Sequence, residues 1–151
     1  MTVSGRGFEP ASGDGPARPG DAGRQAELRT AYEGLLQIRR LVNGPAGTTV
    51  PAPWEVRQMA RAVALVLEAE GTTPSAVDAQ GRRTRTGYRV AAATEPGRVE
   101  VSWLGPPGAG AAEEEQERLT ACAALLERLG WQCLLYRGPR RRRFLEVEPP
   151  R

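Results

Sequence analysis

The sequence of 151 residues predicts an α+β protein in which two N-terminal helices precede a ββαββ unit. Apolar residues recur at helical spacing in three segments, at about 23–43, 54–70 and 111–129. They alternate with polar residues in two further segments, at about 87–104 and 131–148, and each of these contains a Gly/Pro turn. Two hairpins joined by a helix predict a four-stranded, mainly antiparallel sheet with helices packed on it.

The N-terminal segment, residues 1–22, is rich in Gly, Pro, Ala and Asp and has few bulky apolar side chains. Such a segment buries too little surface to offset its ordering entropy, so we expect a disordered tail that can be removed without loss of stability. It also lacks the continuous apolar run of a secretion signal, and no stretch of the chain reaches the roughly 18 apolar residues of a membrane span. We therefore expect one domain over residues 23–149, in the cytoplasm and away from membranes.

The three predicted helices have recognisable ends. The first begins after Asp21, a good N-cap residue, and ends where Gly44 and Pro45 cannot continue it. The second is followed by Gly71 and Pro74. The third begins with the acidic run 113–117, which the dipole of a helix N-terminus favours.

The composition limits what the charge can mean. All 21 basic residues are Arg, because the chain contains neither Lys nor His. Together with abundant Ala, Gly and Pro, this is typical of a bacterial gene from a GC-rich genome. The pI near 9.4 therefore does not by itself indicate a nucleic-acid partner. Cys122 and Cys133 lie in apolar segments, and we interpret them as buried free thiols. Two Cys without His exclude a zinc site of four Cys/His ligands, and we expect no cofactor.

No catalytic constellation is recognisable, and we expect that the protein is not an enzyme. Nucleophilic catalysis most often uses His or Lys as the base, and both are missing. The acidic run 113–117 is explained by a solvated helix start, and Glu146 and Glu148 by a strand with alternating polar residues. The segment 105–110 lacks the Gly-Lys-Ser/Thr signature of a phosphate-binding loop, and its prolines remove amide donors.

Two arginine clusters are the candidate binding residues. The first cluster leads into the first hairpin, and it comprises Arg82, Arg83, Arg85 and Arg89. The second surrounds the tip of the last hairpin with two aromatic neighbours, and it comprises Tyr136, Arg137, Arg140, Arg141, Arg142, Arg143 and Phe144. Guanidinium groups suit phosphates, and outward-facing aromatic rings can stack on bases. The alternative interpretation is a solubilising loop whose arginines pair with nearby glutamates.

These observations leave two hypotheses for the function. The first is a non-catalytic protein-binding or regulatory module that uses the exposed side of the sheet or a charged helix. The second is a nucleic-acid-binding accessory protein that uses the arginine clusters at 82–89 and 137–143. One contiguous basic surface would favour nucleic acid, whereas arginines interleaved with carboxylates would favour the solvated loop. The residues specify neither the partner nor the oligomeric state.

Overall fold

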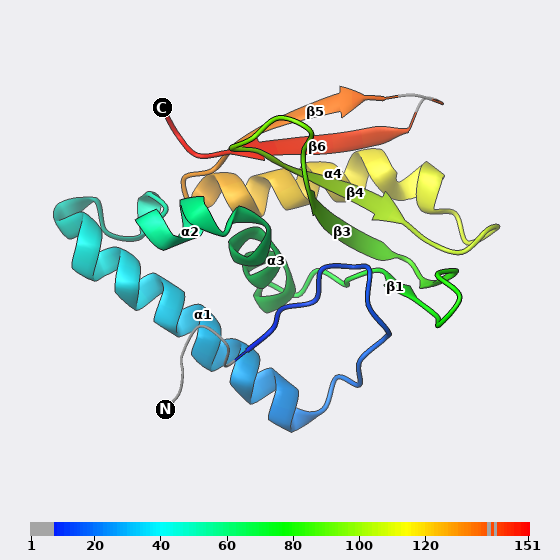
Figure 1. Cartoon of the computed structure of the whole chain (residues 1–151), viewed down its shortest axis with the longest axis horizontal. Helices are drawn as coiled ribbons and strands as arrows, with labels where there is room; N and C mark the ends of the chain where they lie inside the picture. The colour runs from blue at the N-terminus through cyan, green and yellow to red at the C-terminus, as the bar shows by residue number, and fades with distance from the viewer. Residues whose placement is uncertain (1–7, 139, 141) are drawn as a thin grey trace.

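The structure is a computed structural model that describes residues 8–138, 140 and 142–151. In chain order its elements are α1 (Ala22–Asn43), the 3-10 helix η2 (Gly44–Thr49), α2 (Pro53–Arg57), α3 (Met59–Ala69), β1 (Ala76–Val77), β2 (Arg83–Arg85), β3 (Gly87–Ala92), β4 (Val99–Leu104), α4 (Ala111–Arg128), β5 (Gln132–Arg137) and β6 (Arg143–Glu148). The predicted α+β class is confirmed (Figure 1).

A four-stranded antiparallel sheet with the order β3-β4-β6-β5 forms one layer of the protein. Each predicted hairpin supplies two neighbouring strands, β3 with β4 and β5 with β6. The hairpins join through their second strands, where Val101 of β4 lies opposite Leu145 of β6. This arrangement leaves β3 and β5 at the two edges of the sheet.

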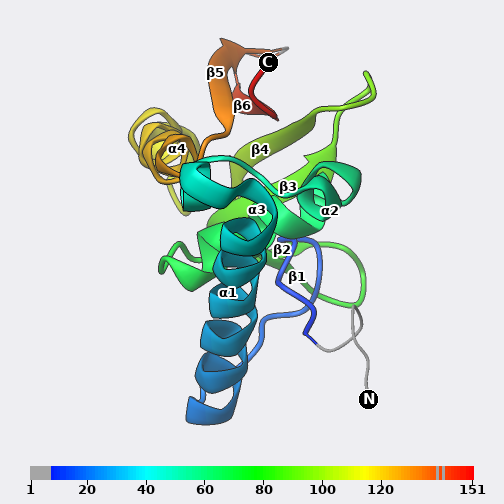
Figure 2. The ribbon, with the colours of Figure 1, turned by 90° about the vertical axis from the view of Figure 1, so that its left-hand side faces the viewer.

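One face of the sheet is apolar and carries the helices. Every second residue of β4 is buried on this face, namely Val99, Val101 and Trp103. Helices α3 and α4 pack against it, and α1 packs against α3 on the side away from the sheet (Figures 1 and 2). The opposite face, called the outer face below, carries no helix of the described chain. No helix in the described ranges is both long and apolar enough to cross a membrane.

A fully buried ion pair fixes α1 to α2. The Nε and Nη2 groups of Arg39 each donate to the carboxylate of Glu55 at 2.7 Å, and both side chains are 0% exposed. The Nη1 group of Arg39 donates to the carbonyls of Thr48 and Leu129, and Glu55 also accepts from the amide of Ala52. These bonds offset the desolvation of the two charges. The pair thereby connects the end of α1 with the start of α2 and the end of α4.

The region predicted as a second helix over 54–70 is interrupted. Helices α2 and α3 are separated at Gln58, whose φ of −130° and ψ of 55° are not helical. The sequence contains no Gly or Pro at this point, and the apolar periodicity continues across it. Neither signal therefore predicts the break. The polar stretch 72–86 also contains the short strands β1 and β2, which periodicity did not indicate because they are only two and three residues long.

For residues 8–20 the structure differs from the predicted disordered tail over 1–22. This segment, called the N-terminal segment below, runs along the edge of β3 (Figure 1). The amide of Val90 donates to the carbonyl of Ser12 at 2.8 Å, and the amide of Val77 donates to the carbonyl of Gly15 at 2.9 Å. Such backbone bonds need no bulky apolar side chain, so composition alone did not indicate them. Residues 1–7 of the predicted tail lie outside the described residues.

Close approach of the N-terminal segment to β3 depends on Gly13. Its φ is +97°, a conformation that L side chains rarely adopt. A Cβ atom at this position would lie 2.2 Å from the carbonyl oxygen of Tyr88 and 2.6 Å from the Cα of Arg89. Glycine therefore allows the two backbones to lie side by side.

Candidate functional site

The first arginine cluster is divided among three elements. Arg82 is exposed in the turn after β1, Arg83 and Arg85 lie on β2, and Arg89 lies on β3. Arg83 and Arg89 approach the same carboxylate, that of Asp14 in the N-terminal segment. Arg83 donates to one oxygen of Asp14 at 2.6 Å and Arg89 to the other at 2.7 Å. Half of this cluster therefore anchors the N-terminal segment.

The electrostatics of Asp14 fit this anchoring role. Partial burial acts to raise the pKa of the Asp14 carboxyl, but hydrogen bonds from Arg89 and Arg83 and their positive charges outweigh it. The net result is a lowered pKa, so Asp14 is ionised at neutral pH. Arg83 also donates to the carbonyl of Gly13 and, at 3.1 Å, to the hydroxyl of Ser75.

The second arginine cluster encloses a buried carboxylate. Glu115 lies in the second turn of α4 and is 1% exposed. Arg142 donates from Nε to Glu115 at 2.7 Å and from Nη2 to the carbonyl of Trp103 at 2.7 Å. The backbone amide of Arg143 donates to Glu115 at 2.8 Å, and its guanidinium lies 3.6 Å from the same carboxylate. These two arginines thus connect the start of β6 to α4.

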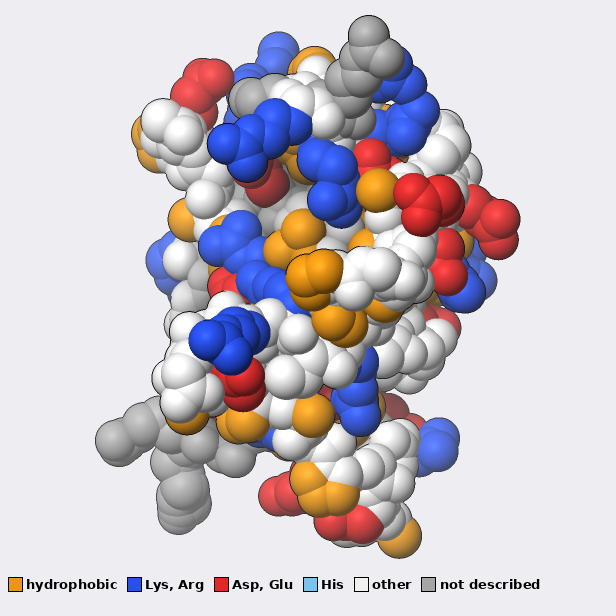
Figure 3. All heavy atoms as spheres, turned by 90° about the vertical axis from the view of Figure 1, so that its right-hand side faces the viewer, with side chains coloured by type: hydrophobic (Ala, Val, Ile, Leu, Met, Phe, Trp, Pro, Cys, Tyr) orange, Lys and Arg blue, Asp and Glu red, His pale blue; other side chains and the backbone are white. Residues whose placement is uncertain are grey.

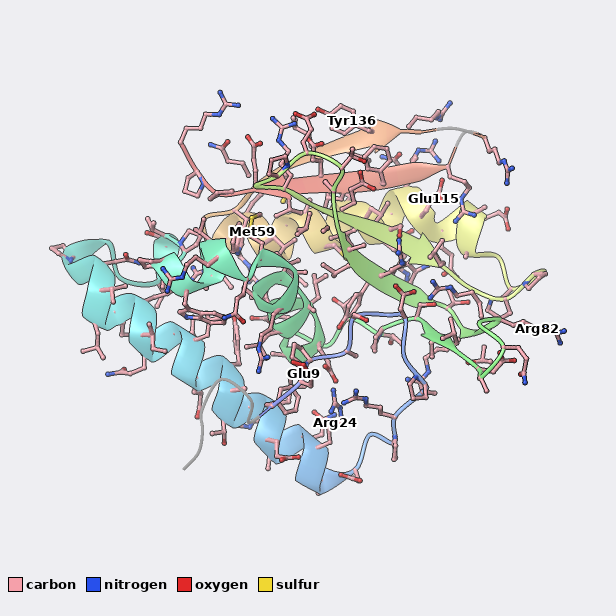
Figure 4. All side chains as sticks on the ribbon, in the orientation of Figure 1. Glu9, Arg24, Met59, Arg82, Glu115 and Tyr136 are labelled. Atoms are coloured by element: carbon pink, nitrogen blue, oxygen red, sulfur yellow. The ribbon has the colours of Figure 1, made fainter. Side chains whose placement is uncertain are left out.

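The remaining arginines do not gather in one place. Among the described residues, Arg82, Arg85, Arg137 and Arg140 have no carboxylate within ion-pair distance. Figure 4 shows that Arg82 and the Tyr136 end of the sheet are well separated. In Figure 3 basic side chains alternate with acidic, apolar and neutral ones over the face that carries the loop ends. Arg141 lies outside the described residues.

The two aromatic residues of the second cluster do face outward. Tyr136 and Phe144 lie opposite each other on β5 and β6, with ring centroids 5.5 Å apart and nearly parallel planes. They lie on the outer face of the sheet, and Tyr136 is 43% exposed. Arg89 lies on the same face. The rings satisfy the orientation that stacking on a base requires, but they already stack on each other.

The two thiols are placed in apolar surroundings. Cys122 is buried on α4, and Cys133 is partly buried on β5. Burial raises the pKa of each thiol to about 12. Both therefore remain protonated at neutral pH, which is the state expected of unreactive structural cysteines. Within the described ranges, no group of three or more Asp, Glu, Cys or His side chains is arranged to hold a metal ion.

Sequence reasoning did not identify two exposed apolar surfaces. The exposed large hydrophobic residues of the described chain form two groups. One comprises Ile38, Leu41 and Val42 on α1 with Val56 on α2, and the other comprises Leu134 and Tyr136 on β5. Isolated exposed apolar residues are ordinary, whereas contiguous ones indicate interaction sites. In the sequence, Ile38 and Val42 share the helical spacing of Leu28 and Leu35, which are buried, and periodicity cannot distinguish two adjacent apolar faces.

The first apolar surface continues into a groove of about 750 Å³ between the N-terminal segment, α1 and the α2–α3 junction. This α1 groove is lined by Phe8, Pro10, Ala26, Glu27, Thr30, Ala31, Gly34, Leu35, Ile38, Trp54, Gln58, Arg61 and Leu65. Its α1 wall is low, since Ala26, Ala31 and Gly34 are small and a Cβ at Gly34 would meet no atom within 4 Å. The guanidinium of Arg61 on the opposite wall is paired with Glu9 at 2.7 Å.

Comparisons with known proteins provide no further assignment for these surfaces. No protein-family model, no curated protein and no solved structure matches the chain.

Proposed function

We propose that the protein is a non-catalytic binding module whose α1 groove holds an amphipathic helix of a partner protein. The observation that carries this proposal is the continuous apolar stripe on α1. It runs from Ala26 through Gly34 and Ile38 to Leu41, which is 74% exposed. These 16 residues correspond to about 24 Å of helix, or just over four turns. That length suits a docked helix better than a compact small molecule.

The chemistry of the groove defines the contact face of this partner. Small residues on the α1 wall allow the backbone of a second helix to approach closely. Arg61 already has a carboxylate partner, so the centre of the groove favours uncharged apolar side chains. Glu27 lies on the same wall and has no cationic partner among the described residues. We therefore propose that the partner helix carries Lys or Arg where it passes Glu27.

Site-specific photo-crosslinking tests this proposal in the cells from which the gene derives. A benzophenone amino acid at Ile38 should crosslink to another protein, and sequencing of the crosslinked peptide should show an amphipathic helix. The same amino acid at Arg40, which is exposed on the other side of α1, is the matched control. The Leu41→Glu variant should lose most of the Ile38 crosslink while keeping its fold, because Leu41 is largely exposed. Equal crosslinking from both positions, or crosslinks to extended peptides only, would contradict the proposal.

Nucleic-acid binding is a second candidate, favoured by the outward-facing pair of Tyr136 and Phe144 beside Arg137. Four arginines of the two clusters already form ion pairs with Asp14 or Glu115, which leaves fewer guanidinium groups to bind phosphates. Titration with labelled single- and double-stranded oligonucleotides tests it. If the unpaired arginines bind phosphates, replacing Arg137 and Arg140 with Gln should lower the slope of log K against log salt by about 0.7–0.9 per lost contact. Flat titrations of the unmodified protein would exclude this candidate.

A further inference from the structure

Among the described residues, strand β5 has an edge whose backbone hydrogen-bonding groups are unpaired. The amide of Gly138 donates to the carbonyl of Arg142 at 2.6 Å, which sets the phase of the β5–β6 ladder. Since bonded and non-bonded pairs alternate, the backbone groups of Leu134 and Tyr136 face β6, and those of Cys133 and Leu135 face outward. When this alternation is followed from β5 through β6 and β4 to β3, the amides of Tyr88 and Val90 face away from the sheet.

The outward-facing amides of β3 are both hydrogen-bonded to other segments of the chain, as this alternation requires. The amide of Tyr88 donates to the carbonyl of Thr73 at 2.9 Å, and the amide of Val90 donates to the carbonyl of Ser12. No backbone hydrogen bond from another described segment reaches the outward-facing groups of β5, the other terminal strand of the sheet. An uncovered edge strand is a template for pairing with another strand.

Strand β5 lacks the features that usually protect an edge. It contains six residues without Pro or a bulge, and only Arg137 at its end is charged. Its outer-face residue Leu134 is 59% exposed, although it lies in the middle of the strand.

We propose that β5 pairs antiparallel with β5 of a second copy of this chain, so that two four-stranded sheets become one continuous sheet. A two-fold axis perpendicular to the sheet, passing between the two Leu134 residues, keeps the apolar faces on the same side. In this register Cys133 lies opposite Leu135 of the second copy, and their outward-facing backbone groups exchange hydrogen bonds in both directions. Gln132 then lies opposite Tyr136 of the second copy.

Charge complementarity favours a second copy as the occupant. The Gln132 end of β5 adjoins a pocket of about 320 Å³ that Glu127, Glu146 and Glu148 line together with Trp131. Glu146 and Glu148 pair with Arg98, whereas Glu127 has no cationic partner among the described residues. The proposed register places Arg137 of the second copy opposite Trp131, next to this acidic pocket. Arg137 has no carboxylate partner in its own chain among the described residues. Each copy therefore offers the cation of Arg137 to the unpaired carboxylate of Glu127 in the other.

Disulfide crosslinking tests the register on the full-length chain. In a Cys133→Ala background, Leu134→Cys should give a crosslinked dimer under mild oxidation. The reason is that a non-hydrogen-bonded pair has its Cα atoms about 4.5 Å apart, within disulfide range. The double variant Gln132→Cys/Tyr136→Cys should also crosslink, whereas each of these single variants should not. Ser102→Cys, on the same face of the central strand β4, is the matched control and should remain monomeric. A Leu134→Cys variant that crosslinks no better than Ser102→Cys would overturn the proposal.

Sedimentation analysis tests the dimer without crosslinks. The unmodified chain should dimerise reversibly, and Leu134→Arg, which places like charges on the axis, should raise the dimer dissociation constant at least about 30-fold. Arg137→Glu and Glu127→Arg should each raise it about threefold to tenfold, and combining them should restore much of the affinity. Circular dichroism shows whether each variant is folded. The proposal would be overturned if the chain remained monomeric at about 100 μM. A monomeric chain that binds an extended peptide at β5 would overturn it as well.

Discussion

The two edges of the sheet differ in how their backbone groups are satisfied. Both β3 and β5 are six-residue strands with outward-facing amides and carbonyls. The β3 edge is covered within the chain by the N-terminal segment and by residues 73–75. The β5 edge is uncovered in the described chain and has exposed apolar side chains beside it. The comparison shows that a polar, glycine-rich segment can complete a sheet, whereas an apolar hairpin strand can leave it open.

The largest expected effect comes from removing the cover of β3. A chain that starts at Asp21 should lose about 2–4 kcal/mol of unfolding free energy, because several hydrogen bonds of about 1 kcal/mol each disappear together. Thermal melts should show this as a fall in Tm of roughly 8–16 °C relative to the full-length chain. Hydrogen exchange at Val90 should accelerate in parallel, because its amide loses the carbonyl of Ser12. Melts that agree within about 4 °C would mean that the N-terminal segment does not cover β3 in solution.

A smaller change at the same edge should have a smaller effect. Gly13→Val should destabilise the protein by more than about 1 kcal/mol, because the positive φ and the 2.2 Å approach of a Cβ to the Tyr88 carbonyl both oppose a side chain. Chemical denaturation measures the change. Gly15→Val is the matched control, because a Cβ at Gly15 would meet no atom within 4 Å. Equal midpoints for the two variants would contradict the proposed contact.

The ion pairs of Asp14 should contribute less than the backbone contacts. Asp14→Asn should cost no more than about 1 kcal/mol, since the carboxylate is 42% exposed and solvent screens it. The folded-state pKa lies below the ordinary value of 3.8, so the contribution is present above about pH 4 and is lost as the pH falls through the folded pKa. Stability measured from pH 6 to pH 2 should therefore converge for the variant and the unmodified chain at the acidic end. A constant difference over this range would exclude a contribution from the ionised carboxylate.

The smallest effect on the fold is expected at the open edge. Leu134→Lys should change the unfolding free energy of the isolated chain by less than about 0.5 kcal/mol, because the side chain is exposed and packs on little. The measurement requires protein concentrations low enough to keep the chain monomeric, since association would add to the apparent stability. A loss above 1 kcal/mol under these conditions would show that Leu134 is covered by another part of the chain, and β5 would then not be an open edge.

The candidate site was only partly accessible from sequence. The arginine clusters are visible in the sequence, but their division between Asp14 and Glu115 is not, because these carboxylates lie 69 and 27 residues away from Arg83 and Arg142. The exposed apolar stripe on α1 could not be predicted from the sequence for a different reason. Leu35 and Ile38 fit one apolar helical pattern, yet Leu35 is 2% exposed and Ile38 is 41% exposed. Only the position of α3 against α1 decides which side of that stripe is covered.

The sequence by itself determined the local structure of this protein. The period of its apolar residues gives α1, α4 and both hairpins, and Asp21 gives the N-cap of α1 through its bond to the Arg24 amide. These features depend on neighbours within a few residues, so the sequence contains them directly. Tertiary structure alone decided the burial of the Arg39–Glu55 pair, the break at Gln58, and which sheet edge is covered. The buried pair and the covered edge depend on groups from distant parts of the chain, whose contacts exist only once the helices and the sheet have packed together. The break at Gln58 has no signal in the sequence.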